Sequence, residues 1–114
     1  MTTITLGGDH LAQMLSIWAA GLTAADYPLG SGECWDRAKA VIKHLDHLPL
    51  QYVEGILHHS GNAMGDKGSG PHAFCLLQVD DEPALIVDAM IGEYLVEVGG
   101  DASEFTWEVP WAPQ

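Results

Sequence analysis

Two segments in the first half of this chain repeat their apolar residues at helical spacing, and strand-like runs follow in the second half. Residues 8–22 predict a helix with Asp9 as its N-cap, and a second helix is predicted from Cys34 to Leu45. The Pro-containing segment 47–49 should end the second helix, because the residue before a proline disfavours helical backbone. We expect the helices to bury two apolar stripes: Leu11, Leu15, Trp18 and Leu22 in the first, and Trp35, Ala38, Ile42 and Leu45 in the second.

The second half of the chain predicts an antiparallel sheet, since short apolar runs alternate there with turn-forming residues. Strands are expected at 51–58, 72–79, 84–90, 93–98 and 104–109. Turns are expected at 80–83 and 90–93. A chain of 114 residues favours one domain, spanning 1–114. Helices followed by strands place it in the α+β class, with N-terminal helices packed on the sheet.

The charge of the chain restricts its partners. Four Lys and Arg residues stand against sixteen Asp and Glu residues, which gives a net charge of −12. So few cations argue against binding to nucleic acid or to an anionic membrane surface, and the acidic balance favours a basic protein as partner or substrate. The start lacks the features of a signal peptide, and no stretch is long enough to cross a bilayer. Two cysteines make no disulfide framework, so we expect a cytoplasmic protein.

Cys34, His72 and Asp88 occur in the order nucleophile, base and acid, which suits thiol chemistry. A free thiol has a pKa near ~8.5, and the start of a helix lowers it because unpaired N–H groups favour the anion. Gly32 lets the backbone approach closely, and the N–H of Cys34 is a candidate donor to an oxyanion. His72 would move the thiol proton, and Asp88 would orient the imidazole.

The parity of the turn before Asp88 tests this hypothesis. His72 and Phe74 point to one face of their strand, whereas Cys75 points to the other and is expected in the core. If the loop between the two strands has an odd number of residues, His72 and Asp88 share a face. A two-residue loop would separate them. Without that convergence, the thiol is simply packed, the histidine hydrogen-bonded and the acid solvated.

Short sequence words around these residues resemble a known family. Gly32-Glu33-Cys34-Trp35 resembles the Gly-x-Cys-Trp word around the nucleophile of papain-like cysteine peptidases. The span from Cys34 to Asp88 resembles small bacterial and phage proteins with a papain-like or transglutaminase-like core. The words that match there are Tyr52-Val53-Glu54-Gly55, His72-Ala73-Phe74 and Val87-Asp88. The resemblance implies a helix packed on an antiparallel sheet, with Cys34, His72 and Asp88 as a catalytic triad.

The chain also departs from that family. The upstream glutamine that papain-like peptidases use for the oxyanion has no clear match, so Ser31 or the backbone near Gly32 would have to serve. Phe74 stands where the family has tryptophan. Trp35 and Glu54 join Ser31 and Gly32 as candidate substrate or oxyanion residues. Glu54 has a second interpretation, as a partly exposed strand acid.

Three further points remain open at the level of sequence. Residues 60–70 hold four glycines and predict a mobile loop, which is either a lid over a site or a surface insertion. Histidines 44, 47, 58 and 59 could be metal ligands, but they match no recognised spacing, and neither a metal nor another cofactor is expected. The chain could also be a non-catalytic acidic binding or inhibitor protein of bacterial or phage origin, on a degenerate papain-like fold.

The sequence thus predicts a thiol-dependent hydrolase or acyltransferase. It would act on an amide or isopeptide bond of a protein or peptide through a Cys34 thioester. Its order of residues does not distinguish water from an amine as the acceptor.

Overall fold

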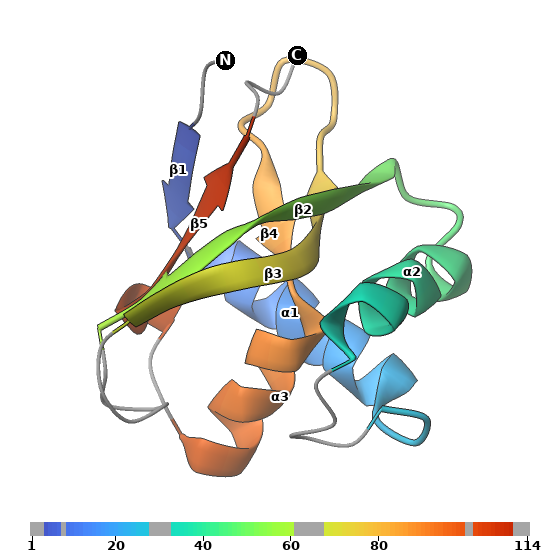
Figure 1. Cartoon of the computed structure of the whole chain (residues 1–114). Helices are drawn as coiled ribbons and strands as arrows, with labels where there is room; N and C mark the ends of the chain where they lie inside the picture. Colours follow the sequence, from blue (N-terminus) through green and yellow to red (C-terminus); the bar gives the residue numbers. More distant parts are fainter. Residues whose placement is uncertain (1–3, 8, 28–32, 61–67, 100–101, 111–114) are drawn as a thin grey trace.

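The computed structural model describes residues 4–7, 9–27, 33–60, 68–99 and 102–110. These residues form an α+β fold with a five-stranded antiparallel sheet in the order β1-β5-β2-β3-β4 (Figure 1). The elements, in chain order, are β1 (Ile4–Gly7), α1 (His10–Thr23), α2 (Cys34–His44), β2 (Leu50–His59), β3 (Gly68–Leu77), β4 (Leu85–Val87), α3 (Ala89–Val98), a 3-10 turn (Ala102–Glu104) and β5 (Phe105–Val109). None of the described helices is long and apolar enough to cross a membrane.

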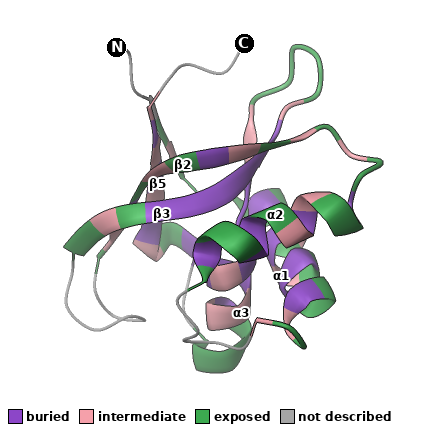
Figure 2. Ribbon diagram, turned by 45° about the vertical axis from the view of Figure 1, so that its right-hand side comes forward, coloured by how far each residue is buried: buried purple, intermediate pink, exposed green. Residues whose placement is uncertain are grey.

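The two faces of the sheet carry different helices. Because side chains alternate along a strand, Phe74 and Leu76 of β3 point to one face, where they join Ile91 and Leu95 of α3 in a buried cluster. Cys75, on the opposite face, belongs to a second cluster with Ala38 and Val41 of α2. In Figure 1, α1 and α3 lie below the sheet and α2 lies beside β3. Figure 2 shows that β3 is buried along much of its length.

A free strand edge lies between these two clusters. Over the described residues, β4 pairs with β3 only from Cys75 to Leu77, while β2 pairs with the whole of β3. The chain then leaves the sheet at Asp88 and enters α3. The segment of β3 that precedes Cys75 therefore presents one edge to α2, and His72 lies in that segment.

The expected strands 84–90 and 93–98 are wrong in large part, because α3 occupies Ala89–Val98. The expected turn at 90–93 also lies within this helix. Asp88 starts it as an N-cap, accepting a hydrogen bond from the N–H of Ile91 at 3.2 Å. Gly99 ends it in the left-handed conformation, with φ of 79°. A short apolar run bounded by an acid and a glycine suits either a strand or a helix, and packing against α1 decides here for the helix.

The expected buried stripe of α1 is wrong at three of its four positions, and only Leu15 packs, half-buried, against the cluster that contains Cys75. Leu11, Trp18 and Leu22 are exposed, and the buried face of the helix consists of small residues: Ala12, Ser16, Ala19, Ala20 and Thr23. Gly92 of α3 explains the inversion, because a Cβ at this position would overlap the backbone of Ser16 and Ile17. Two helices this close need small side chains between them, so the bulky residues of α1 face outward.

The other predicted helices and strands are confirmed with shifted boundaries. Asp9 caps α1, accepting from the N–H of Ala12 at 2.8 Å. In α2, Ala38 and Leu45 are buried as expected, while Ile42 is half-buried and Trp35 is 40% exposed. β3 begins within the expected loop 60–70, of which 61–67 lie outside the described residues, and ends two residues before the expected end at 79. β1 is an addition that the sequence pattern did not predict.

Candidate active site

Cys34 is the first residue of α2, and its thiol is buried with 8% of the residue exposed. Glu33 occupies the N-cap without a side-chain hydrogen bond to the helix. Burial acts to raise the pKa of Cys34, but a hydrogen bond with His72, a backbone hydrogen bond from Ala73 and the charge of His72 outweigh it. The pKa of the thiol is therefore lowered, in the direction that favours a thiolate.

His72 joins Cys34 to Asp88. Its Nε2 lies 2.7 Å from Oδ2 of Asp88, which leaves Nδ1 as the ring nitrogen for the thiol. Burial acts to lower the pKa of His72, but the charge and hydrogen bond of Asp88, together with the hydrogen bond and charge of Cys34, raise it to about 10. With a lowered thiol pKa and a raised imidazole pKa, a proton shared by the two groups favours the imidazole, so thiolate with imidazolium is favoured over thiol with neutral imidazole.

The parity condition set by the sequence is met. The register pairs Leu76 with Ile86 and Leu77 with Leu85, so residues 78–84 form the connector, an odd number. Asp88, just beyond the end of β4, is thereby placed on the same face as His72. The 2.7 Å distance between the two side chains is the direct result.

Asp88 is almost fully buried, with 2% of the residue exposed. Its Oδ2 accepts a hydrogen bond from Nε1 of Trp107 at 2.8 Å, and its own N–H donates to Oγ of Ser16 at 2.9 Å. Burial acts to raise the pKa of Asp88, but the charge and hydrogen bond of His72 and hydrogen bonds from Trp107 and Ile91 lower it. The carboxylate thus stays ionised in a buried position, where it can hold the imidazolium.

Trp107 and Ser16 were missed by the sequence analysis. Trp107 lies on β5, and Ser16 lies in the middle of α1 on the face toward α3. Both act on Asp88 from elements distant in sequence. Strand alternation alone predicts that Trp107 is buried, and nothing in the sequence pairs its indole N–H with one particular acid.

A groove of 350 Å³ opens beside the thiol and the imidazole. Its lining consists of Cys34, Trp35, Leu57, His59, Ser69, Gly70, Pro71, His72 and Met90. These residues include no Asp, Glu, Lys or Arg, and apolar side chains from four elements, α2, β2, β3 and α3, make up much of the lining. Trp35, which was proposed for substrate contact, lies at this groove and is 40% exposed.

Glu54 lies elsewhere. It pairs with Ala73 across the sheet, so its side chain points away from the face of His72, and it is not among the lining residues of the groove. It accepts a hydrogen bond from the hydroxyl of Tyr52 at 3.2 Å. Burial, Glu54 and the nearby Cys34 raise the pKa of Tyr52 to about 12, so this hydroxyl stays protonated. Ser31 and Gly32, the other two candidates, lie outside the described residues.

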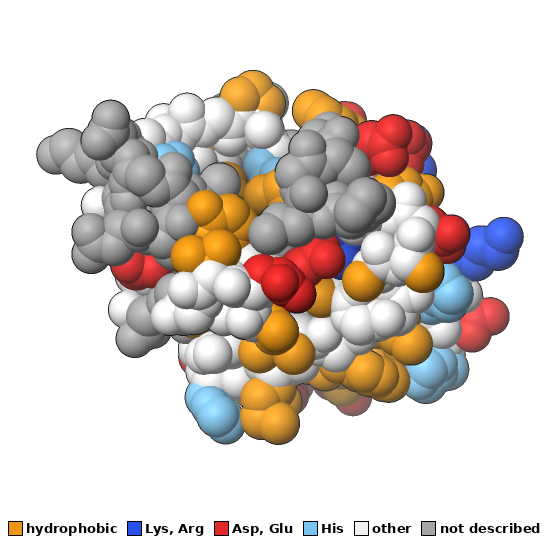
Figure 3. Space-filling view, turned by 90° about the horizontal axis from the view of Figure 1, so that it is seen from below, with side chains coloured by type: hydrophobic (Ala, Val, Ile, Leu, Met, Phe, Trp, Pro, Cys, Tyr) orange, Lys and Arg blue, Asp and Glu red, His pale blue; other side chains and the backbone are white. Residues whose placement is uncertain are grey.

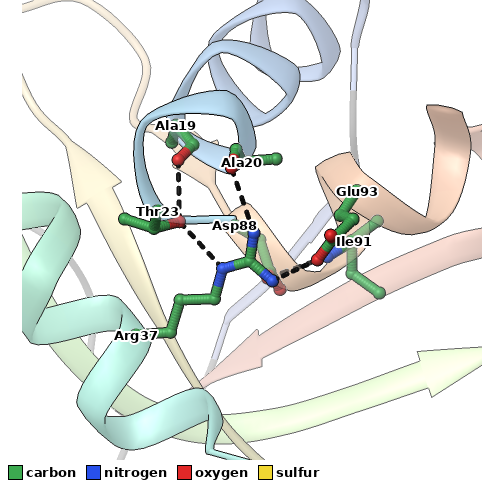
Figure 4. Close-up of polar contacts among 7 residues, drawn as sticks. All are labelled: Ala19, Ala20, Thr23, Arg37, Asp88, Ile91 and Glu93. Carbon is green, nitrogen blue, oxygen red and sulfur yellow. Dashed lines mark hydrogen bonds and ion pairs between the residues drawn. The ribbon is translucent and has the colours of Figure 1, made fainter. Parts of the chain in front are cut away.

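A buried arginine fixes α2 one turn after Cys34 (Figure 4). Arg37 donates from Nε to Oγ1 of Thr23 at 2.8 Å and from Nη2 to the carbonyl oxygen of Ala20 at 3.1 Å. Its Nη1 forms an ion pair with Glu93 of α3. The guanidinium thereby joins the end of α1, the first turns of α2 and the first turns of α3. The helix that carries the thiol is anchored to both helices below the sheet.

The second cysteine has a different environment. Cys75 is fully buried, and its Sγ donates to the carbonyl oxygen of Ala38 at 3.3 Å. Burial, with the charge of Asp88, raises the pKa of this thiol to about 12. Its expected place in the core is confirmed. In the described ranges, no three His, Cys, Asp or Glu side chains are grouped as a metal ion would need.

The comparisons with known proteins give no further identification. No family model, no curated protein and no solved structure matches this chain. The structure itself brings together three reactive groups: a thiol at the start of a helix, an imidazole hydrogen-bonded to it and a buried carboxylate hydrogen-bonded to the imidazole.

Proposed function

We propose that this chain is a thiol-dependent hydrolase or acyltransferase with a papain-like or transglutaminase-like core, acting on an amide or isopeptide bond through a Cys34 thioester. The observation that carries the proposal is that His72 is hydrogen-bonded to both Cys34 and Asp88. A helix-start thiol with an oriented imidazole is the arrangement that nucleophilic catalysis requires. The groove beside the pair offers room for an acyl group.

The proposed reaction has two steps. The Cys34 thiolate attacks the carbonyl carbon, and the N–H groups at the start of α2 would donate hydrogen bonds to the oxyanion. The imidazolium of His72 gives its proton to the leaving amine, the C–N bond breaks and a thioester forms. In the second step, neutral His72 takes a proton from water or an amine as it attacks the thioester. The C–S bond breaks, and the thiolate and imidazolium are restored.

The groove favours an uncharged acyl group. Trp35, Leu57 and Met90 give it apolar walls, and the described residues that line it include no Asp, Glu, Lys or Arg. A charged side chain that enters such a groove would lose hydration, and none of these four residue types lines the groove to pair with it. Acyl groups with aromatic or aliphatic side chains should therefore react faster than their acidic counterparts.

The first experiment measures thiol reactivity against pH. With the pKa of Cys34 lowered and that of His72 raised to about 10, alkylation by iodoacetamide should persist well below the pKa of a free thiol, near ~8.5. His72→Ala removes the hydrogen bond and the charge of His72 that lower the thiol pKa, and it leaves the burial of the thiol and the backbone hydrogen bond from Ala73. The rate at pH 6 should therefore fall at least tenfold. Cys75→Ala is the matched control and should not change the rate. If Cys34 reacts with iodoacetamide no faster than a model thiol at this pH, His72 does not activate the Cys34 thiol.

Trapping of the acyl-enzyme tests the chemistry itself. Incubation with the p-nitrophenyl ester of N-acetylphenylalanine should add one acyl group to the chain, seen by intact mass, and Cys34→Ala should abolish it. The ester of N-acetylaspartate should react more slowly. Asp88→Asn should slow acylation by roughly 10²-fold or more, the scale of a misoriented general base. Acylation that is unchanged in Cys34→Ala would exclude the proposed thioester.

A further inference from the structure

An apolar stripe on the outer face of α1 has no role in the site described above. Leu11, Met14, Trp18 and Leu22 are 53%, 56%, 47% and 38% exposed. They recur every three or four residues, the spacing at which one helix face meets another helix. α1 has no Asp, Glu, Lys or Arg in its 14 residues. We refer to these four residues as the α1 stripe.

A groove between α1 and α3 adjoins the α1 stripe. Its volume is 230 Å³, and it is lined by Ile17, Ala20, Gly21, Ala24, Glu93, Val96 and Glu97. Gly21 borders open space there, because a Cβ at this position would meet nothing within 4 Å. Val96, on the α3 side, is 60% exposed. An apolar side chain from outside could therefore seat between the helices.

The charges at this groove indicate what could cover it. The two carboxylates of the lining, Glu93 and Glu97, both come from α3, and Glu97 is exposed. Figure 3, which shows the molecule from below, has hydrophobic and acidic side chains next to each other on this side. The whole chain has a net charge of −12. Glu93 is already paired with Arg37, so a basic partner gains from the exposed Glu97 and from the net negative charge of the chain. A second copy of the chain would bring the same negative charge to the contact.

We propose that the α1 stripe and the adjoining groove bind an amphipathic, basic helical segment of a partner protein. Its apolar face would pack on the α1 stripe, one apolar side chain would enter the groove beside Gly21, and Lys or Arg residues would lie next to Glu97. At 1.5 Å per residue, α1 offers about 21 Å of helix, the length of roughly four turns of a partner. The inference does not rest on the proposed catalytic function.

The test uses a 14-residue peptide of leucine and lysine whose leucines fall on one helical face. The control peptide has the same composition in an order that gives no apolar face. Calorimetric titration of the full chain should give an affinity for the amphipathic peptide at least tenfold higher than for the control. Equal affinities would overturn the proposal, because they would indicate attraction by net charge alone.

Variants of the α1 stripe separate packing from charge. Met14→Glu and Leu22→Glu add negative charge, so plain attraction predicts tighter binding, whereas the proposal predicts a loss of at least tenfold. Val79→Glu is the matched control: Val79 is 44% exposed, lies in the connector after β3 and should leave the affinity unchanged. Glu97→Lys should weaken binding by severalfold. Circular dichroism checks that each variant is folded.

Two further measurements test which molecule binds the α1 stripe and whether this binding is independent of the thiol. Sedimentation should show a monomer, and a dimer that Met14→Glu dissociates would overturn the proposal in favour of a second copy. Cys34→Ala should bind the amphipathic peptide as tightly as the unmodified chain. The loss of acylation in Cys34→Ala would then be independent of peptide binding. The proposed thioester chemistry and the proposed peptide binding can therefore fail separately.

Discussion

At the scale of single residues, the indole of Trp107 helps to fix the orientation of the Asp88 carboxylate toward His72. Oδ2 of Asp88 receives both Nε2 of His72, at 2.7 Å, and Nε1 of Trp107, at 2.8 Å. Oδ1 accepts from the N–H of Ile91 at 3.2 Å. A carboxylate held by three donors cannot rotate away from the imidazole without losing hydrogen bonds. Trp107 is therefore a positioning residue, because it acts on the thiol only through Asp88 and His72.

We predict that Trp107→Phe weakens the interaction between Asp88 and His72 while leaving the fold intact. A phenyl ring fills most of the space, but Asp88 loses one of the donors that hold it and lower its pKa, so the pKa of Asp88 should rise. A carboxylate that can turn away from the imidazole stabilises the imidazolium less, so the pKa of His72 should fall. Removing a hydrogen bond to a buried charge should lower the free energy of unfolding by about 2 kcal/mol. NMR titration of His72 measures the first effect, and urea unfolding the second.

The control for this change is Trp35→Phe, since Trp35 is exposed at the groove whereas Asp88 is buried. It should leave the pKa of His72 where it was, although it is free to change the rate with apolar acyl esters. A His72 titration that is the same in Trp107→Phe and the unmodified chain would show that the indole only fills space.

At the scale of elements, the position of Asp88 depends on how closely α1 and α3 approach. Ser16 of α1 accepts the N–H of Asp88, and Gly92 of α3 packs against the backbone of that same serine. Arg37 ties both helices to α2. The helix contact below the sheet thus sets the distance between the acid, which caps α3, and the thiol, which begins α2.

Two glycines of this helix pair make a matched test. In Gly92→Ala the added Cβ would overlap backbone atoms of Ser16 and Ile17, so the helices must separate, at a cost of about 2–3 kcal/mol in the free energy of unfolding. In Gly21→Ala the Cβ meets nothing within 4 Å, and the better helix propensity of alanine should add about 0.5–1 kcal/mol. Alkylation of Cys34 at pH 6 should slow only in the first variant. Equal stabilities for the two would show that the helices are loosely packed.

These same helices show where sequence reasoning ends. Local signals predicted Asp9 as a cap, Cys34 as the start of α2 and the alternation that places His72, because each depends on neighbours in the chain. The buried face of α1 could not be predicted in this way. Periodicity indicates that a helix has an apolar stripe, but Gly92, more than seventy positions away, decides which face is covered.

The site was predicted in part for the same reason. The order of Cys34, His72 and Asp88 is local information, and the odd connector 78–84 brings the last two together. Asp88 itself was expected within a strand, whereas it ends β4 and caps α3. Arg37, Ser16 and Trp107 carry no sequence signal for their roles, since each contact joins elements that only the tertiary fold brings together.

At the scale of the whole molecule, charge acts in opposite directions on folding and on binding. A net charge of −12 on a chain of 114 residues repels itself in the folded state, and dissolved salt screens that repulsion. The Debye length falls from about 30 Å at 0.01 M to about 10 Å at 0.1 M ionic strength. We predict that the melting temperature rises by several degrees between 0.01 and 0.3 M NaCl, whereas binding of the lysine-rich amphipathic peptide weakens several-fold over the same range.

A charge-reduced variant isolates the electrostatic part of this prediction. Asp46, Asp81 and Glu82 are exposed and lie away from the α1 stripe and the active-site groove, so changing all three to lysine roughly halves the net charge. Calorimetry in NaCl should show a smaller rise of the melting temperature for this variant, because less repulsion remains to be screened. Peptide affinity should keep its dependence on Met14 and Leu22, since apolar contact does not weaken with salt. An identical salt response in the two chains would mean that the excess charge is not what limits stability.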